Sequence, residues 1–335
     1  MNWNEGFTGA YHLRQVDPGT WLDMGDYDIQ SGKIDRIKDG LLESASVEMQ
    51  ERPPAWVRII MDAEQDGVER EALFTGLTST PRRSIDGVRE SFTVDCYSVL
   101  LPARVPLELG SYIPEGADAP EAVRKLLKAT PAPVTISDDD HPRLTQSIVA
   151  STEDTALDMA WAVLSAVDWT MRIDGFGRIT LQPVDHAPVT MMGAEEGDIL
   201  SMEVSDEQDT FSCPNCFRAI MGSTVAVARD DDPDSEYSTV TRGYEVWETE
   251  TSVTLGTGES LAQYAMRRLR ELQSAGRQIS YTRRYLPDVR PGDCVRINYP
   301  DSGLDGIFEV TSQGLTLGYG CETEEGATLW ATMTT

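Results

Sequence analysis

The sequence has 335 residues, with 28 lysines and arginines against 56 aspartates and glutamates, and its formal net charge is −28. A surface this acidic repels phosphate, so we expect no direct binding to nucleic acid. No apolar run approaches the roughly 20 residues that span a bilayer, and "MNWNEGFTGAYHL" lacks the basic start and apolar core of a signal peptide. We therefore expect a soluble chain of two or three domains without membrane insertion.

The first region, residues 1–110, is rich in predicted strands. "AWVRIIMD" and "EALFTGLTST" are separated by a segment that contains Asp66-Gly67, a dipeptide typical of hairpin turns. "SIDGVRESFTVDCYSVL" repeats the pattern with Asp86-Gly87 at the turn. We expect an antiparallel meander and assign residues 1–110 to a first β-barrel-like domain.

Residues 111–185 change in composition and predict a small α+β unit. Asp118 is expected to cap a short helix, with Pro120 in its first turn. Ser151 and Asp154 have the spacing of a capping box and are expected to start a second helix. The second helix has an apolar face made of Leu157, Ala160, Trp161, Leu164 and Val167. A turn at Asp174 to Gly177 then joins two short strands.

Strand patterns resume in residues 186–335, in "ILSMEVS", "FRAIMGSTVAVAR", "GYEVWETETSV", "GIFEVTSQGLTLG" and "GATLWATM". A helix at about 258–274 carries an apolar stripe made of Leu261, Ala265, Leu269 and Leu272. In "YLPDVRPGDCVRINYP" the Pro291-Gly292 turn predicts a strand from Cys294 to Asn298. The expected fold class is α+β, predominantly β, with two barrel-like antiparallel domains, 1–110 and 186–335, around the α+β insertion.

The five cysteines are few and odd in number, which favours a reducing site of synthesis over a disulfide framework. Cys213 and Cys216 have C-x-x-C spacing, yet there is no second such pair, and His12, His141 and His186 are isolated in the sequence. A redox motif would stand at a helix start after a strand, whereas this pair leads into a predicted strand. We interpret both as structural thiols, with a metal or redox pair as the alternative.

The other candidate motifs are incomplete. Ser260 in "GESLA" lacks the last glycine of a nucleophile elbow and is expected to start a helix. "GTGESL", "GFGRIT" and "GYGCET" lack the third glycine of a phosphate-binding loop and are interpreted as turns. Asp230, Asp232 and Asp234 have calcium-loop spacing without its glycine and glutamate, and "SDDDH" (137–141) is expected to be a charged turn. We expect no catalytic residue, no cofactor-binding residue, no cofactor and no metal ligand.

Four stretches resemble the tail-tip or baseplate hub proteins of bacteriophages and related contractile injection machines. They are "SGKIDRIKDGLLESASVEM", "LFTGLTSTPRRSIDGVRESFTVDCYSVLLPARV", "ALDMAWAVLSAVDWTMRIDGFGRITLQP" and "AMRRLRELQSAGRQISYTRRYLPDVRPGDCVRINY". They follow the order of the family and span most of the chain. At "DTFSCPNCFRAIMGS" the chain keeps an asparagine, Asn215, but departs from the family by carrying cysteines.

The resemblance implies a structural virion protein at the tail tip, synthesised in the host cytoplasm. A homotrimer with two similar barrels per chain would present a pseudo-sixfold ring to the tail tube and threefold symmetry to the central spike. Pro291, Gly292 and Asp293 would start a strand of the second barrel, with a "LFTGLTSTPRR" hairpin as its counterpart in the first. The implied partners are the tail tube or distal tail protein, the central spike or tip protein, the tape measure protein, and DNA in passage without specific binding.

The resemblance leaves two alternatives to a non-enzymatic hub. One is a tail-associated cell-wall or glycan hydrolase, which the lack of a catalytic motif disfavours. The other is a receptor- or carbohydrate-binding module, in which Trp3, Trp21, Trp247 and Trp330 would stack on sugars. For the hub itself, we expect acidic side chains of both barrels to line a channel from which passing DNA is repelled.

Overall fold

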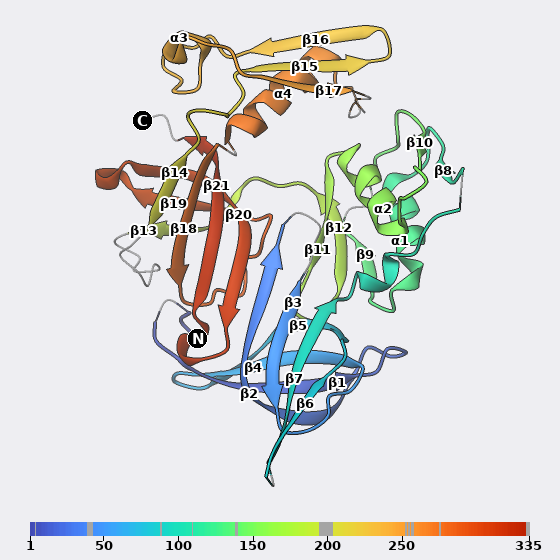
Figure 1. Ribbon diagram of the computed structural model, residues 1–335, viewed down its shortest axis with the longest axis vertical. Helices are drawn as coiled ribbons and strands as arrows, with labels where there is room; N and C mark the ends of the chain where they lie inside the picture. Colours follow the sequence, from blue (N-terminus) through green and yellow to red (C-terminus); the bar gives the residue numbers. More distant parts are fainter. Residues whose placement is uncertain are drawn as a thin grey trace.

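The computed structural model describes residues 1–332 except 4, 39–42, 88, 109, 138–139, 194–203, 252, 254, 256–257 and 275. Most described residues with regular structure lie in antiparallel strands, and helices are few and short. The expected α+β class with predominant β structure is confirmed. Four separate clusters of buried apolar side chains form the cores of the chain, and Figure 1 shows the four corresponding regions.

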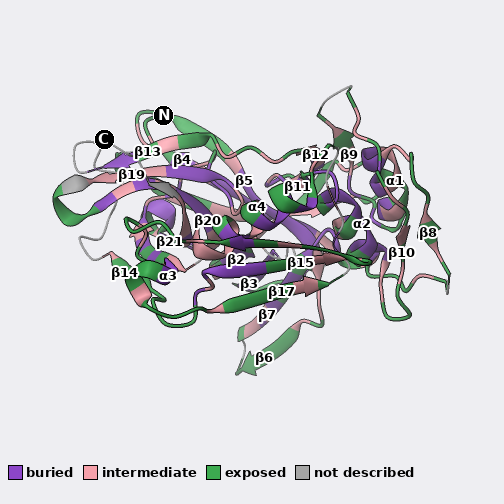
Figure 2. Cartoon of the chain, turned by 90° about the horizontal axis from the view of Figure 1, so that it is seen from above, coloured by how far each residue is buried: buried purple, intermediate pink, exposed green. Residues whose placement is uncertain are grey.

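The N-terminal region is a closed barrel. Its strands are β1 (Thr8–Val16), β2 (Asp23–Ile37), β3 (Ser44–Met49), β4 (Trp56–Glu64), β5 (Val68–Thr78), β6 (Arg82–Asp86) and β7 (Arg89–Ser98). The order β1-β4-β5-β7-β3-β2 closes because β2 also pairs with β1. Alternation along β3 places Ala45, Val47 and Met49 inside the barrel and leaves the residues between them facing outward. β6 pairs with β7 and is exposed along its length (Figure 2).

The two turn predictions in this region are confirmed, and one hairpin prediction is wrong. The β4–β5 ladder ends at Glu64 opposite Val68, and the β6–β7 ladder ends at Asp86 opposite Arg89. The segment "LFTGLTSTPRR" forms no hairpin, because β5 and β6 pair in succession with the two ends of β7. Pro81 lies between them, and since proline has no N–H, it interrupts the ladder that β5 would otherwise continue.

The insertion has its own core beneath two helices and a three-stranded sheet. Its elements are β8 (Tyr112–Ile113), α1 (Ala119–Leu126), β9 (Val134–Ile136), β10 (Ile148–Val149), α2 (Ala156–Ser165), β11 (Trp169–Ile173) and β12 (Ile179–Pro183). Asp118 caps α1 by accepting a hydrogen bond from the Glu121 N–H at 3.1 Å, as predicted. The apolar face predicted for α2 packs into the core.

The start predicted for α2 is wrong, because a second capping motif further along the chain begins the helix. Thr155, not Ser151, is the N-cap, and it forms a capping box with Asp158. Ser151 and Asp154 make only a local turn, in which the Ser151 N–H donates to the Asp154 carboxylate at 2.6 Å. Both pairs have the same spacing, and the pair next to the buried apolar face caps the helix.

A second β unit is built from β13 (Pro188–Gly193), β14 (Ser205–Gln208), β18 (Arg277–Arg283), β19 (Cys294–Tyr299), β20 (Leu304–Thr316) and β21 (Thr323–Thr332). Their order is β13-β19-β20-β21-β18-β14. β19 follows the predicted turn, where Gly292 has a φ of 95°, a value that favours glycine. The strand predicted in "ILSMEVS" lies outside the described residues up to Glu203.

Residues 209–276, here named the α4 module, are inserted between β14 and β18 and have a separate core. The elements are β15 (Cys216–Met221), β16 (Thr224–Arg229), α3 (Thr239–Arg242), β17 (Trp247–Thr251) and α4 (Leu261–Ser274). α4 covers one face of the sheet β16-β15-β17 with its predicted stripe, and the module lies at one end of the molecule (Figure 1). The domain limits at residues 110 and 185 stay a prediction. Among the described helices none is long and apolar enough to cross a membrane.

Candidate functional site

The two cysteines of the C-x-x-C motif are buried against backbone. The Cys213 Sγ lies 3.7 Å from the Leu272 carbonyl oxygen at the end of α4, and Cys216 opens β15 inside the α4 module. Burial raises the pKa of the Cys213 thiol to about 11. A thiol protonated at neutral pH is a poor nucleophile and a poor metal ligand, which favours the interpretation of the pair as structural thiols.

The three histidines lie in three different parts of the molecule. His12 lies on the outside of the barrel beside three aspartates, and His141 pairs with the α1 cap Asp118 at 2.9 Å. His186 stacks on Trp330 with ring centroids 3.6 Å apart. Within the described part of the chain, no group of histidines, cysteines and carboxylates has the geometry to hold a metal ion.

The acidic motifs and Ser260 have local structural roles. Asp230 accepts hydrogen bonds from the Asp232 N–H, the Ser235 hydroxyl and Gln273, so its carboxylate shapes the loop. In "SDDDH", Asp138 and Asp139 lie outside the described residues. The Ser260 Oγ accepts from the Gln263 N–H at 3.3 Å at the start of α4, as its sequence position predicts.

The four tryptophans considered for sugar stacking have four different settings. Trp3 packs edge-on against Phe7 and Tyr285, and Trp21 donates its indole N–H to the Phe176 carbonyl oxygen at 2.8 Å. Trp330 is half-buried under His186. Trp247 is on the α4 module, with 40% of its surface exposed. They lie in four separate segments of the chain and do not form one platform.

The most extended surface feature is one face of a continuous sheet that runs through both β units. β2 pairs with β20 from Lys33–Thr316 to Ile37–Ser312, which joins the barrel to the second unit. The resulting antiparallel ladder of eight strands has the order β6-β7-β3-β2-β20-β21-β18-β14. This arrangement was not predicted, because no local sequence signal specifies a pairing between segments so far apart in the chain.

The outward side of this ladder carries many polar and small residues, and the charged ones named below are mostly acidic. Cross-strand pairing aligns the residues that we name the ladder face: Lys33, Asp35, Ser46, Glu48, Asp95, Ser280, Thr282, Ser312, Gly314, Glu324 and Gly326. None of them is buried. The face carries four carboxylates and one ammonium, and Lys33 lies 3.1 Å from Asp35. A wide sheet face with this alternation is one that meets water rather than a core.

A row of buried charged and polar side chains stabilises the junction between the two β units. Arg36 on β2 is 1% exposed and donates to the Gln313 amide oxygen at 3.1 Å and to the Leu73 carbonyl. Gln313 in turn donates to Glu325 at 2.5 Å, and Glu325 accepts from Arg283 at 2.8 Å. The row therefore links β2, β20, β21 and β18 directly behind the ladder face.

The electrostatics of this row favour a single strand register. Burial, and then the charge of Arg290, lowers the pKa of Arg36, while Glu43 opposes both effects. Burial lowers the pKa of Arg283 but pairing with Glu325 leaves it raised. Because an unpaired charge here would lack solvation, a slip of one residue between β2 and β20 is strongly disfavoured.

The tip of the β11–β12 hairpin attaches the insertion to the barrel. The Gly175 carbonyl oxygen accepts from the Thr75 hydroxyl at 2.7 Å, and the Phe176 carbonyl accepts from Arg58 at 3.1 Å. The Phe176 ring lies between the guanidinium groups of Arg58 and Arg178, each 5.1 Å from its centroid. A Cβ on Gly175 would come within 1.6 Å of the Ala72 carbonyl oxygen, so this close approach requires glycine.

A cleft of about 1060 Å³ lies between the insertion, the second β unit and α4. Its charged side chains largely neutralise one another. Lys38 pairs with Glu309 at 2.6 Å, Arg172 pairs with Asp293, and α4 pairs its own arginines with Glu271. The cleft thus separates three regions without presenting a concentrated charge of either sign to a ligand.

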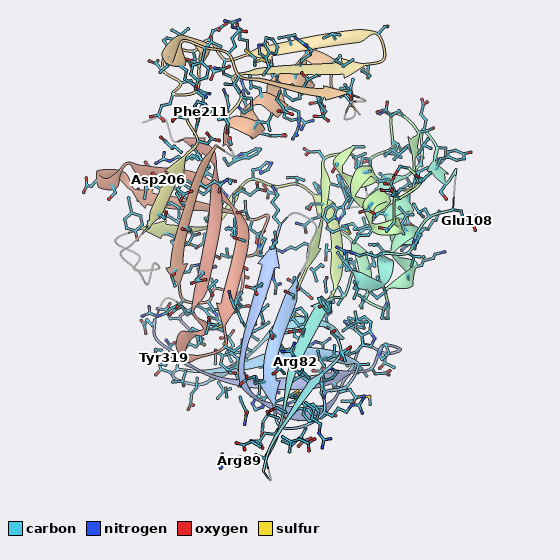
Figure 3. The ribbon with its side chains drawn as sticks, in the orientation of Figure 1. Arg82, Arg89, Glu108, Asp206, Phe211 and Tyr319 are labelled. Carbon is cyan, nitrogen blue, oxygen red and sulfur yellow. The ribbon has the colours of Figure 1, made fainter. Side chains whose placement is uncertain are left out.

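The two end strands of the ladder differ in charge. β6 reads "RRSID" and is exposed at every residue, and β14 reads "SDEQ" and is also exposed throughout. Each has one described strand neighbour, so one edge of each is open. Figure 3 shows Arg82 and Arg89 on the arm formed by β6 and β7 at one end of the molecule, and Asp206 on the opposite margin of the sheet. Among the described residues, neither Arg82 nor Glu207 forms an ion pair.

The fold matches solved phage tail proteins along nearly its whole length. A tail protein from Neisseria meningitidis superposes with a TM-score of 0.71 at 15% identity, covering 96% of this chain and 98% of that one. The 43 kDa tail protein of prophage MuSo2 from Shewanella oneidensis gives 0.63 at 12% identity, covering 95% and 97%.

A secretion protein has a related fold. An E. coli component of the type VI secretion system, described as structurally similar to the bacteriophage T4 tail proteins gp27 and gp5, gives a TM-score of 0.51 at 9% identity, covering 91% of this chain and 74% of that one. No family model matches the sequence, and no curated protein matches it. The fold is therefore that of phage tail and hub-like proteins, as the sequence resemblance implied, and it is seen in structure rather than in residue identity.

Proposed function

We propose that this chain is a structural component of a phage tail tip, a hub ring that adapts the sixfold tail tube to the threefold spike and leaves a channel for DNA. The observation that carries the proposal is the ladder of eight antiparallel strands, which has an exposed acidic face and two open ends of opposite charge. The likeness to solved tail proteins supports the setting.

The strand count supports a closed ring. Each β unit contributes four strands to the ladder, β6, β7, β3 and β2 from the barrel and β20, β21, β18 and β14 from the second unit. Three copies then offer six groups of four strands, which is a pseudo-sixfold arrangement. Because eight is even, β6 of one copy can join β14 of the next in an antiparallel pair without reversing a chain.

The dimensions and charge fit a conduit. Twenty-four strands spaced about 4.8 Å apart enclose a ring about 37 Å across between backbones before strand tilt widens it. The four carboxylates of the ladder face would repeat in each copy around this ring. Coulomb repulsion between these groups and DNA phosphates would keep a passing duplex from adhering.

The partners follow from this role. The homotrimer would contact the tail tube or distal tail protein on one side and the central spike or tip protein on the other, with the tape measure protein in or near the channel. It would reside in the virion after synthesis in the host cytoplasm. The ring itself performs no reaction and needs no cofactor.

A charge exchange across the proposed joint tests the ring. Arg82→Glu places a carboxylate on β6 opposite the acidic edge of the neighbour's β14, and it should convert a trimer to monomers in sedimentation analysis. Glu207→Arg alone should have the same effect, because it leaves arginines facing one another. The combination of both changes should restore the trimer. Trimers that persist in both single variants, or a double variant that stays monomeric, would refute the β6–β14 joint.

A further inference from the structure

The sheet β16-β15-β17 of the α4 module is covered on one side only. Phe217, Ala219 and Ala228 point toward α4 and are buried. The opposite side, here named the outer face, carries Arg218 and Ile220 from β15, Val225 and Val227 from β16, and Trp247 from β17. Val225 is 53% exposed, Val227 54% and Trp247 40%. A sheet face with this composition is normally covered.

The sequence of β16 is typical of a strand that is covered on both sides. The strand reads "TVAVAR", so apolar residues point to both of its sides. Strands that are apolar on both sides are typical of sheets buried on both faces. α4 supplies one cover, and none of the residues that the structure describes supplies the other. β16 is also an edge strand, with β15 as its one described neighbour.

The charge of the outer face is unlike that of the rest of the chain. The three strands direct no carboxylate side chain to it, in a protein with 56 acidic residues. The Arg218 guanidinium lies over the Trp247 ring at 4.9 Å, and Arg218 has no ion pair among the described residues. Tryptophan and arginine are the residues that most often dominate the energy of protein interfaces.

Two copies of a chain with a net charge of −28 repel each other at a distance. Contacts between copies are therefore favoured where at least one of the two surfaces lacks carboxylates. The three strands direct no carboxylate to the outer face, and the Glu245 carboxylate at its margin, which accepts from the Trp247 indole N–H at 2.8 Å, is already paired with Arg229. An acidic surface on a second copy complements Arg218. We propose that the outer face packs against a neighbouring copy of this chain, as a contact separate from the β6–β14 joint. The ring arrangement of the copies rests on the proposed function.

The contact is tested with the purified chain of 335 residues. Val227→Glu and Arg218→Glu alter the outer face at exposed positions, and Val68→Glu is the matched control at a valine that is 68% exposed on the barrel. Each variant is checked by thermal unfolding, and its dissociation constant is measured by sedimentation. A photo-crosslinking residue in place of Val227 reports what lies on the face.

We expect the two outer-face variants to raise the dissociation constant at least about tenfold at an unchanged melting temperature, and we expect Val68→Glu to leave the dissociation constant unchanged. The crosslinked product should have twice the mass of the chain. If Arg82→Glu dissociates the copies and the outer-face variants do not, the result supports the ring and refutes the contact at the outer face. A crosslinked dimer from a chain that forms no trimer would support this contact and refute the ring. If the residue at position 227 forms no crosslink, the outer face does not contact a second copy. The same holds if the chain binds single-stranded DNA and Trp247→Ala abolishes that binding.

Discussion

Gly175 at the tip of the β11–β12 hairpin provides a direct test of how the insertion is held. In the folded chain the position that a Cβ would occupy lies 1.6 Å from the Ala72 carbonyl oxygen and 2.4 Å from its carbon. Both atoms belong to backbone in the middle of β5, so no side-chain rotation can relieve the overlap. Gly175→Ala must therefore push the hairpin tip away from the barrel.

The cost can be worked out from the contacts at the tip. Withdrawal breaks three hydrogen bonds, from Thr75 at 2.7 Å, from Trp21 at 2.8 Å and from Arg58 at 3.1 Å. At about 1 kcal/mol each, with about 0.5–1 kcal/mol for the stacking of Arg58 on Phe176, the expected loss is roughly 3–4 kcal/mol. Arg58 keeps its partner Asp23, which prevents a larger penalty.

The measurement is urea unfolding followed by tryptophan fluorescence, because Trp21 and Trp56 pack against each other beside the tip. Gly67→Ala is the matched control, since a Cβ on Gly67 in the β4–β5 turn meets nothing within 4 Å. We expect the control to stay within about 0.5 kcal/mol of the unaltered chain. If Gly175→Ala is as stable as Gly67→Ala, the insertion is not held by this tip and the reasoning fails.

Three further predictions concern buried charge, pH and the proposed channel. Arg283→Met should destabilise the fold by about 3–5 kcal/mol because it leaves the buried Glu325 carboxylate unpaired. Replacing Glu325 with leucine as well should recover part of this loss. If chemical unfolding shows the same loss of stability for the single and the double variant, the prediction is wrong. Asp62→Asn should cost about 0.5 kcal/mol at pH 7. The hydrogen bonds from its arginine partner lower the Asp62 pKa from 3.8, so this difference should vanish as the pH falls through the lowered pKa and should persist above 3.8. Asp35→Lys combined with Glu324→Lys should slow DNA ejection from assembled particles, and unchanged kinetics would remove the channel role.

Local features of the fold were predictable where neighbouring residues decide the backbone. The turns at Asp66-Gly67 and Asp86-Gly87 and the α1 cap at Asp118 all occur as predicted. The start of α2 was missed because two capping motifs overlap, and only the buried face distinguishes Thr155 from Ser151. The β5–β6 segment was missed because a strand interrupted at Pro81 has the same local pattern as a hairpin.

The candidate site was less accessible from sequence. "GFGRIT" was correctly interpreted as a turn, but its docking on the barrel depends on the Ala72 backbone, about a hundred residues away. The separate core of the α4 module was also missed, because an inserted unit continues the strand and helix patterns of the unit around it. An apolar pattern on both sides of β16 was the one signal that could have indicated its outer face.

The sequence by itself determined the helix stripes, the turns, most strands and the acidity of the surface, because capping, φ preference and side-chain alternation act over a few residues. The tertiary structure decided which strands lie side by side. Arg36 meets Gln313 across 277 positions of sequence, and that buried contact joins two β units into one ladder with one acidic face. Such a pairing is selected by the cost of leaving a buried charge without a partner, a cost that arises only after the whole chain has closed around it.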